Sequence, residues 1–106
     1  MLKYSVIVPV NYNDGTEIPP ELIQEFEFEV MVLTGGITRE SMTEGKWLGV
    51  HRETYIDKGI KYAIAVTEEN LPKLQNLVRR YMKAFGQVAY YREIDKQTDV
   101  DIEMVD

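Results

Sequence analysis

Several side chains that could bind a ligand or take part in a reaction lie close together in the sequence, within residues 39–57. They include two arginines and the single tryptophan and single histidine of the 106-residue sequence. Arg39 and Arg52 present planar guanidinium groups that can hold a carboxylate or a phosphate through paired hydrogen bonds. Trp47 and Tyr55 offer flat apolar surfaces on which a ligand can stack. These four residues are our predicted binding site for a small anionic ligand or a protein partner.

His51 and Asp57, in the same segment, point to a different chemistry, which is proton transfer. Histidine titrates near neutral pH, and a neighbouring carboxylate would set its tautomer. The pair works only if folding brings the two side chains together, and a lone histidine is more often structural or exposed than catalytic. The alternative function is therefore a small dimeric α/β-barrel-type enzyme in which His51 and Asp57 move a proton.

Composition excludes several other kinds of site. The chain has no cysteine, so it forms no disulfide, thiolate metal site or iron–sulfur cluster. One histidine cannot build the usual zinc site, and no phosphate-binding glycine motif is present. We therefore predict no metal and no cofactor. The net charge of −6 also argues against duplex nucleic acid as a partner, because proteins that bind it carry a basic excess.

Nothing in the sequence indicates export or insertion into a membrane. Met1 to Tyr4 leads directly into a strand-like pattern, with no long apolar segment and no small-residue cleavage site. No stretch approaches the roughly 20 apolar residues of a membrane span. Together with the lack of cysteine, these features predict a cytoplasmic protein with no membrane partner.

The spacing of apolar residues predicts the elements that must position these side chains. Residues 2–10 alternate with a period of two, as in a half-buried strand, and residues 60–66 do the same. Residues 71–85 repeat apolar positions every three or four residues, as a helix does, and residues 87–94 read as a closing strand. The segment 37–66 reads as extended, with a bulge or loop that interrupts it at residues 41–45 and a turn or bulge at residues 57–59. It forms either two long bent strands or three shorter ones.

Residues 20–34 carry two conflicting patterns. Residues 25–30 alternate with a period of two, which is typical of a strand, but Pro19-Pro20 and Gly35-Gly36 are start and stop signals of a helix. We predict a helix on the strength of those signals. Such a helix has a second apolar face directed away from the sheet, made of Phe28, Met31 and Val32. Apolar residues on two faces indicate burial on both, so we predict that this second face joins copies of the chain in a homo-oligomer.

The order of these elements is strand, helix, strand, strand, helix, strand. It predicts an α+β fold, a ferredoxin-like βαββαβ sandwich in which an antiparallel sheet carries two helices on one face. Residues 1–94 form a single domain of this kind. Residues 95–106 hold five acidic residues and one lysine, and they read as an acidic C-terminal tail, either flexible or paired with a sheet edge.

Several short motifs run through residues 4–94. They are Gly36-Ile37-Thr38, Gly45-Lys46-Trp47 with the polar hairpin through Arg52, and the run from Tyr81 through Phe85-Gly86-Gln87. In this order they resemble an uncharacterised family of small bacterial α+β proteins. The resemblance implies a ferredoxin-like sandwich and no known activity. In architecture alone the chain is also similar to the PII-like sensors and the dimeric α/β-barrel proteins, from which no residue roles carry over.

These features together predict a non-enzymatic, homo-oligomeric binding module for a small anionic ligand or a protein partner. The proton-transfer enzyme described above is the alternative. A third hypothesis is a structural or host-interaction protein whose acidic tail makes the recognition.

Overall fold

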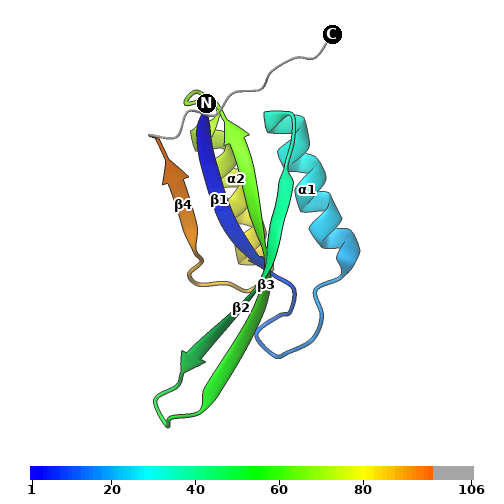
Figure 1. Ribbon diagram of the computed structural model, residues 1–106. Helices are drawn as coiled ribbons and strands as arrows, with labels where there is room; N and C mark the ends of the chain where they lie inside the picture. The colour runs from blue at the N-terminus through cyan, green and yellow to red at the C-terminus, as the bar shows by residue number, and fades with distance from the viewer. Residues whose placement is uncertain (97–106) are drawn as a thin grey trace.

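The computed structural model describes residues 1–96 as one four-stranded antiparallel sheet with two helices (Figure 1). In chain order the elements are β1 (Leu2–Pro9), α1 (Pro20–Thr34), β2 (Thr38–Leu48), β3 (Thr54–Val66), α2 (Leu71–Ala84) and β4 (Arg92–Asp95). The strands lie in the order β2-β3-β1-β4. The predicted ferredoxin-like sandwich is confirmed. All but the first two residues of the predicted acidic tail fall outside the described residues.

One apolar core fills the space between the sheet and the helices. Tyr4 of β1 lies opposite Ile64 of β3, and alternate residues of both strands are buried on the same face. Both helices reach this core, because the ring of Phe26 in α1 lies 5.7 Å from the ring of Tyr62 and 5.3 Å from that of Tyr81 in α2. These packed rings hold both helices to one face of the sheet, as predicted.

α1 is a helix despite the alternating pattern in its middle. The chain enters it through Pro19 and Pro20, and it leaves at Gly35, whose φ of 94° is a left-handed conformation that suits glycine. The residues that α1 buries are Ile23, Phe26 and Val30. The start and stop signals therefore predicted the element correctly. Neither α1 nor α2, the two helices of the described residues, is long and apolar enough to cross a membrane.

β2 and β3 form a long hairpin that projects beyond the rest of the sheet (Figure 1). Their pairing continues out to Leu48, which lies opposite Thr54. β1 ends much earlier, at Pro9 opposite Gly59, so the outer part of the hairpin is a ribbon of two strands. We call residues 42–58 the arm, which comprises this ribbon and the two residues of β2 that lead into it, Met42 and Thr43. The segment between the helices is thus two long strands, which settles the choice that the sequence left open.

Two details predicted for this hairpin are wrong. The sequence indicated an interruption at residues 41–45 and a turn or bulge at residues 57–59, but both segments lie in continuous strand. The irregularity falls instead between residues 39 and 41, where Glu40 is the extra residue that has no partner in the ladder. Cross-strand pairing along the hairpin is therefore stronger than the turn preferences of the residues in it.

The closing strand is shorter than predicted. Residues 87–94 were expected to be extended, but β4 covers Arg92–Asp95 and pairs there with β1. The reason lies at the end of α2. The N–H of Gln87 donates to the carbonyl of Met82, and Gly86 takes a φ of 77°, so these residues complete the helix cap before a strand can begin.

Candidate functional site

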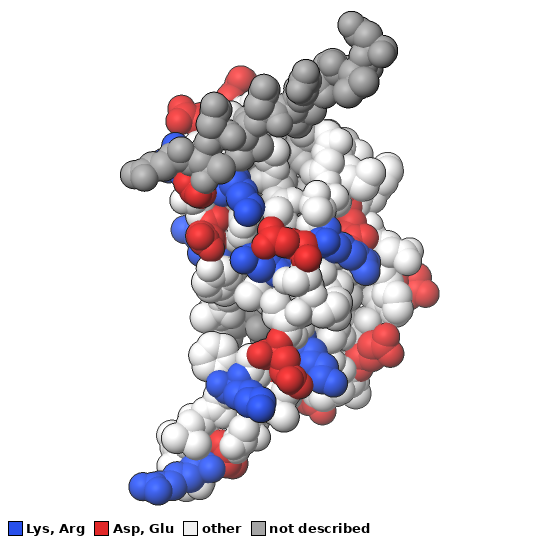
Figure 2. All heavy atoms as spheres, in the orientation of Figure 1, with Lys and Arg blue, Asp and Glu red and all other residues white. Residues whose placement is uncertain are grey.

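The arm exposes a large share of the apolar surface of the molecule. Half of the twelve large apolar residues that are exposed within residues 1–96 lie on it: Met42, Trp47, Leu48, Val50, Tyr55 and Ile56. Trp47 lies opposite Tyr55 on one face of the ribbon, and Ile56 lies on the other face. Figure 2 shows the arm projecting from the body with a basic group at its outer tip. Large contiguous exposed apolar surfaces are typical of interaction sites.

The four residues of the predicted binding site are spread along the hairpin. Arg39 lies at its base, opposite Tyr62, whereas Trp47 and Tyr55 face each other in the middle of the arm. Arg52 lies in the turn at the tip. At about 3.3 Å per residue, the seven residues from Tyr62 to Tyr55 separate Arg39 from the aromatic pair by roughly 23 Å. A single chain therefore does not assemble these four residues into one site.

His51 and Asp57 are also separated in the structure. Asp57 lies opposite Gly45 in the ladder, and the last pair before the turn includes Thr54. Asp57 is three positions along β3 from Thr54, which is about 10 Å, and His51 lies beyond Thr54 in the turn, exposed. The hairpin does not bring the two side chains together within one chain.

The second apolar face of α1 points away from the sheet, as predicted. Phe28, Met31 and Val32 are 64%, 46% and 71% exposed. We call these three residues the α1 outer face. The helix that carries them has four glutamates and no lysine or arginine, but two of these carboxylates are paired with arginines of β2 and α2. Its role in joining copies of the chain stays a prediction.

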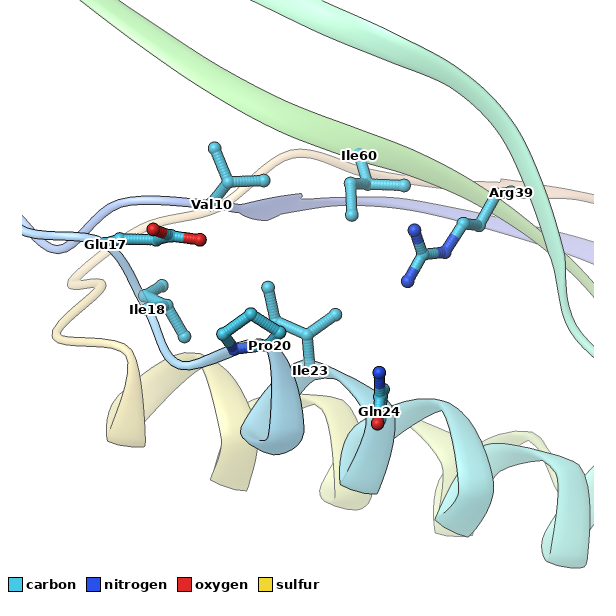
Figure 3. A pocket seen from close by; sticks show the side chains of 8 residues that line it. All are labelled: Val10, Glu17, Ile18, Pro20, Ile23, Gln24, Arg39 and Ile60. Atoms are coloured by element: carbon cyan, nitrogen blue, oxygen red, sulfur yellow. The ribbon is translucent and has the colours of Figure 1, made fainter.

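A pocket of about 230 Å³ opens where the end of β1, the start of α1 and the base of the hairpin meet (Figure 3). Its apolar lining consists of Val10, Ile18, Pro20, Ile23 and Ile60. Its polar lining consists of Glu17, Gln24 and Arg39. Arg39 is thus the predicted binding residue that lies at this pocket, and the sequence analysis missed the other seven.

Arg39 is held in place at the pocket by α1. Its Nε donates to Oε2 of Glu27 at 2.6 Å, and the hydroxyl of Tyr62 donates to the same oxygen. Because Nε is engaged, the two terminal nitrogens of the guanidinium are left facing the pocket (Figure 3). The hydrogen bond to Glu27 raises the pKa of Arg39, so its positive charge is permanent.

Glu27 is ionised, and its role is to hold other side chains in place rather than to act as a general acid or base. Burial alone would raise the pKa of Glu27, but the hydrogen bonds from Arg39 and Tyr62 outweigh it and lower that pKa. Burial and the same carboxylate raise the pKa of Tyr62. The carboxylate and the phenol therefore keep their charge states across the neutral range, and the group serves to orient Arg39.

A second carboxylate of α1 makes a matching set of contacts on the other side of the helix. Glu29 accepts a hydrogen bond from the hydroxyl of Tyr81, and Nη2 of Arg80 donates to its two oxygens at 2.9 and 3.0 Å. The hydrogen bond from Tyr81 is the main cause that lowers the pKa of Glu29. Glu27 therefore ties α1 to the hairpin and Glu29 ties it to α2, so the wall of the pocket formed by α1 is fixed.

Glu17 is positioned by the tight loop that follows β1. Asp14 accepts hydrogen bonds from the N–H of Thr16 at 2.9 Å and from its hydroxyl at 2.6 Å. Asn13 donates to the carbonyl of Gly86 at 2.9 Å, which ties the loop to the end of α2. The loop thus presents Glu17 with its carboxylate directed into the pocket (Figure 3).

Comparison with known proteins identifies the fold. No protein-family profile matches the chain, and no curated protein matches its sequence. Among solved structures, the chain is similar to a phage SAM lyase in complex with S-methyl-5′-thioadenosine, with a TM-score of 0.63 and 14% identity over 89% of this chain and 79% of that one. A phage SAM lyase in the apo state gives a TM-score of 0.59 and 14% identity over 89% and 78%. This similarity supports the α+β fold, and the resemblance to a bacterial family stays a prediction.

Proposed function

We propose that this chain is a homo-oligomeric binding module, in which copies associate through the arm and a small ligand occupies the pocket at its base. The observation that carries the proposal is the set of six exposed apolar residues on a hairpin that projects from the core. Covering one such side chain contributes about 1.5 to 3 kcal/mol. The arm therefore offers a large stabilisation that is realised only when another surface lies against it.

The partner that best suits the arm is the α1 outer face of a second copy. That face is apolar, like the arm, and its three exposed side chains stand on a helix with four glutamates. The arm as a whole has three acidic and three basic residues, but residues 46–52 at its end carry Lys46 and Arg52 and no acidic residue, so charge at this end favours the same match. Apolar contact would supply the affinity, and opposite charges would set the orientation.

The size of the pocket suits a small ligand. The volume within one chain is about 230 Å³, whereas sites that enclose a drug-sized molecule measure about 300–1,000 Å³. The pocket lies between α1 and the base of the hairpin, whereas the α1 outer face points away from the sheet, so one chain forms the pocket without the contact between copies.

Light scattering coupled to size-exclusion chromatography tests the association. The wild type is expected to have the mass of more than one chain at micromolar concentrations. Two double variants should shift it toward a single chain: Leu48→Ser with Ile56→Thr on the arm, and Phe28→Ser with Val32→Ser on the α1 outer face. Val88→Ser is the matched control, because Val88 is fully exposed away from both surfaces. A wild type with the mass of one chain at every concentration would overturn the proposal.

Mixing the two double variants tests which surfaces meet. The arm variant keeps its α1 outer face and the α1 variant keeps its arm, so one intact contact can form between them. We expect the mixture to recover a heterodimer that neither variant forms alone. If arms instead pair with arms, mixing restores nothing, and the assignment of α1 as the docking surface is wrong.

A second candidate function is that of a small enzyme acting on SAM. It is favoured by the structural similarity to phage SAM lyase over 89% of this chain, although one fold hosts many functions. The test is incubation of the protein with SAM and detection of S-methyl-5′-thioadenosine by mass spectrometry. Product that disappears in Arg39→Gln would support this candidate, and loss in His51→Ala would support proton transfer by His51. A yield of S-methyl-5′-thioadenosine no higher than in a protein-free control would rule out this candidate function.

A further inference from the structure

Two opposite charges face each other across the pocket at the base of the hairpin (Figure 3). The carboxylate of Glu17 points into it from the loop after β1, and the terminal nitrogens of Arg39 point into it from β2. Glu17 takes part in none of the ion pairs found within residues 1–96. Arg39 is paired with Glu27 through its Nε alone. Each of the two charged groups thus keeps a side that a ligand can contact.

Hydrogen bonds hold the loop that carries Glu17 and the side chain of Arg39 in position. Glu17 stands on a loop that is closed by hydrogen bonds of its own and tied to the end of α2. Arg39 is oriented by Glu27, which also accepts a hydrogen bond from Tyr62. Groups held in this way lose little further freedom when a ligand binds, so their contacts contribute more to affinity.

The surface between the two charges is apolar. Val10, Ile18, Ile23 and Ile60 line it, and Gln24 adds one neutral amide at its side. An apolar surface of this kind favours a hydrocarbon segment over a second charged group. A ligand that carried one charge alone would satisfy one end of the pocket and be repelled at the other.

We propose that this pocket takes a small zwitterion, with its carboxylate on the terminal nitrogens of Arg39, its ammonium group on Glu17 and a short aliphatic spacer between them. The inference rests on the proposed function in one respect, that the pocket is a ligand site. The sequence predicted a small anionic ligand, and this proposal adds that the other end of the ligand carries a positive charge. An aliphatic amino acid with its charges at opposite ends is the simplest member of this class.

The test is a titration with ω-amino acids from 4-aminobutyrate to 8-aminooctanoate, followed by the backbone amide shifts of residues 10, 18 and 60. The acid and the amine of equal length serve as matched probes, for example hexanoate and hexylamine for 6-aminohexanoate. We expect one length of amino acid to bind best, and to bind about tenfold or more tightly than its acid or its amine. Equal affinity for the acid and the amino acid, or no shift with any probe, would overturn the proposal.

Variants assign the two ends of the ligand. Glu17→Gln should reduce the affinity for the amino acid to that for the acid, and Arg39→Gln should reduce it to that for the amine. Glu69→Gln and Arg79→Gln, which change the same residue types at exposed positions outside the pocket, should alter nothing. If Arg39→Gln does not fold because Glu27 loses its partner, the exposed Glu17 still provides the test. An unchanged preference in Glu17→Gln would overturn the proposal.

Light scattering on the same samples separates this inference from self-association. If a protein with the mass of one chain binds the zwitterion, the proposed ligand class stands and the proposed self-association is wrong. If an oligomer shows no preference for the zwitterion, the self-association stands and the proposed ligand class is wrong. The two proposals therefore fail on different measurements.

Discussion

The inner and outer halves of β3 both carry isoleucine and tyrosine, but these residues lie in different surroundings. Ile56 and Ile60 lie four residues apart on the same face of the strand, yet Ile56 is 55% exposed and Ile60 is 4% exposed. Tyr55 and Tyr62 differ in the same way. The comparison teaches that an apolar strand pattern does not reveal whether its residues stabilise the fold of one chain or are available to a partner.

The difference arises because the layers above the strand end part of the way along it. Ile60 belongs to the core shared with both helices, whereas Ile56 lies past the point where β1 stops. Burial in the body contributes to the folding of a single chain. The apolar residues of the arm contribute nothing of this kind until a second molecule covers them. Substitutions in the two regions should therefore affect different measurements.

The largest effect is expected from Phe26→Ala in the body. Phe26 is fully buried between the rings of Tyr62 and Tyr81, so its loss leaves a cavity and should lower the free energy of unfolding by about 3 to 5 kcal/mol. Urea denaturation measures it. The matched control, under conditions where the protein is monomeric, is Phe28→Ala, two residues along the same helix and exposed, with an expected change within about 0.5 kcal/mol. Equal losses in the two variants would contradict the division between core and docking surface.

A smaller effect is expected where the body and the arm meet. A Cβ atom at Gly59 would lie 2.8 Å from Cγ2 of Ile7 and 2.9 Å from the carbonyl oxygen of Val8, so backbone must shift to admit it. Gly59→Ala should therefore lower the free energy of unfolding by about 1 to 3 kcal/mol. At Gly36 a Cβ meets nothing within 4 Å, and Gly36→Ala is the control. A Gly59→Ala protein as stable as the control would show that this junction is loosely packed.

Acid should weaken the contact between α1 and the hairpin. The pKa of Glu27 is lower in the fold than in the unfolded chain. Its contribution is therefore fully present above its usual pKa of about 4.3 and is lost as the pH falls through the folded value. Glu27→Gln should cost about 1 to 2 kcal/mol at pH 7 and nothing at a pH where the carboxyl is protonated. Unfolding measured across pH checks this, with the exposed Glu21→Gln as control, and a cost that does not change with pH would contradict it.

The smallest effect on a single chain is expected from the arm. Leu48→Ser with Ile56→Thr should change the free energy of unfolding by less than about 0.5 kcal/mol per site under conditions where the protein is monomeric. The wild-type melting temperature should rise with protein concentration, because association stabilises the folded state. That dependence should vanish in the variant. If the free energy of unfolding of the monomeric variant is much lower than that of the wild type, the arm stabilises its own chain, which would contradict this prediction.

The sequence predicted the body well because local signals and tertiary packing agree there. The prolines and glycines that bound α1 and the regular spacing along α2 each indicate the element that forms. The arm was harder to predict. Asp57-Lys58-Gly59 has the residues of a turn, but Lys58 lies opposite Glu44 in a regular ladder, and pairing with a distant strand is not visible in local sequence.

The pocket was predicted only at Arg39. Guanidinium chemistry drew attention to this residue, whereas Glu17 lies in a loop whose pattern indicates a turn and nothing more. The two meet only because β1 and β2 both border β3. The alternation of glutamate along residues 25–29 was a missed signal, since Glu27 and Glu29 anchor the helix on its two sides.

β1 ends at Pro9, and Val10 donates one further hydrogen bond to the carbonyl of Lys58 at 3.1 Å, so the arm projects beyond this point as two strands alone. A ribbon of two strands is marginally stable by itself in water. Its amide hydrogens should therefore exchange with deuterium much sooner than those of Tyr62 to Val66, which lie between two neighbouring strands. Contact with another molecule would slow exchange along the arm and leave the inner residues unchanged, so that a time course of deuterium uptake maps the docked surface position by position.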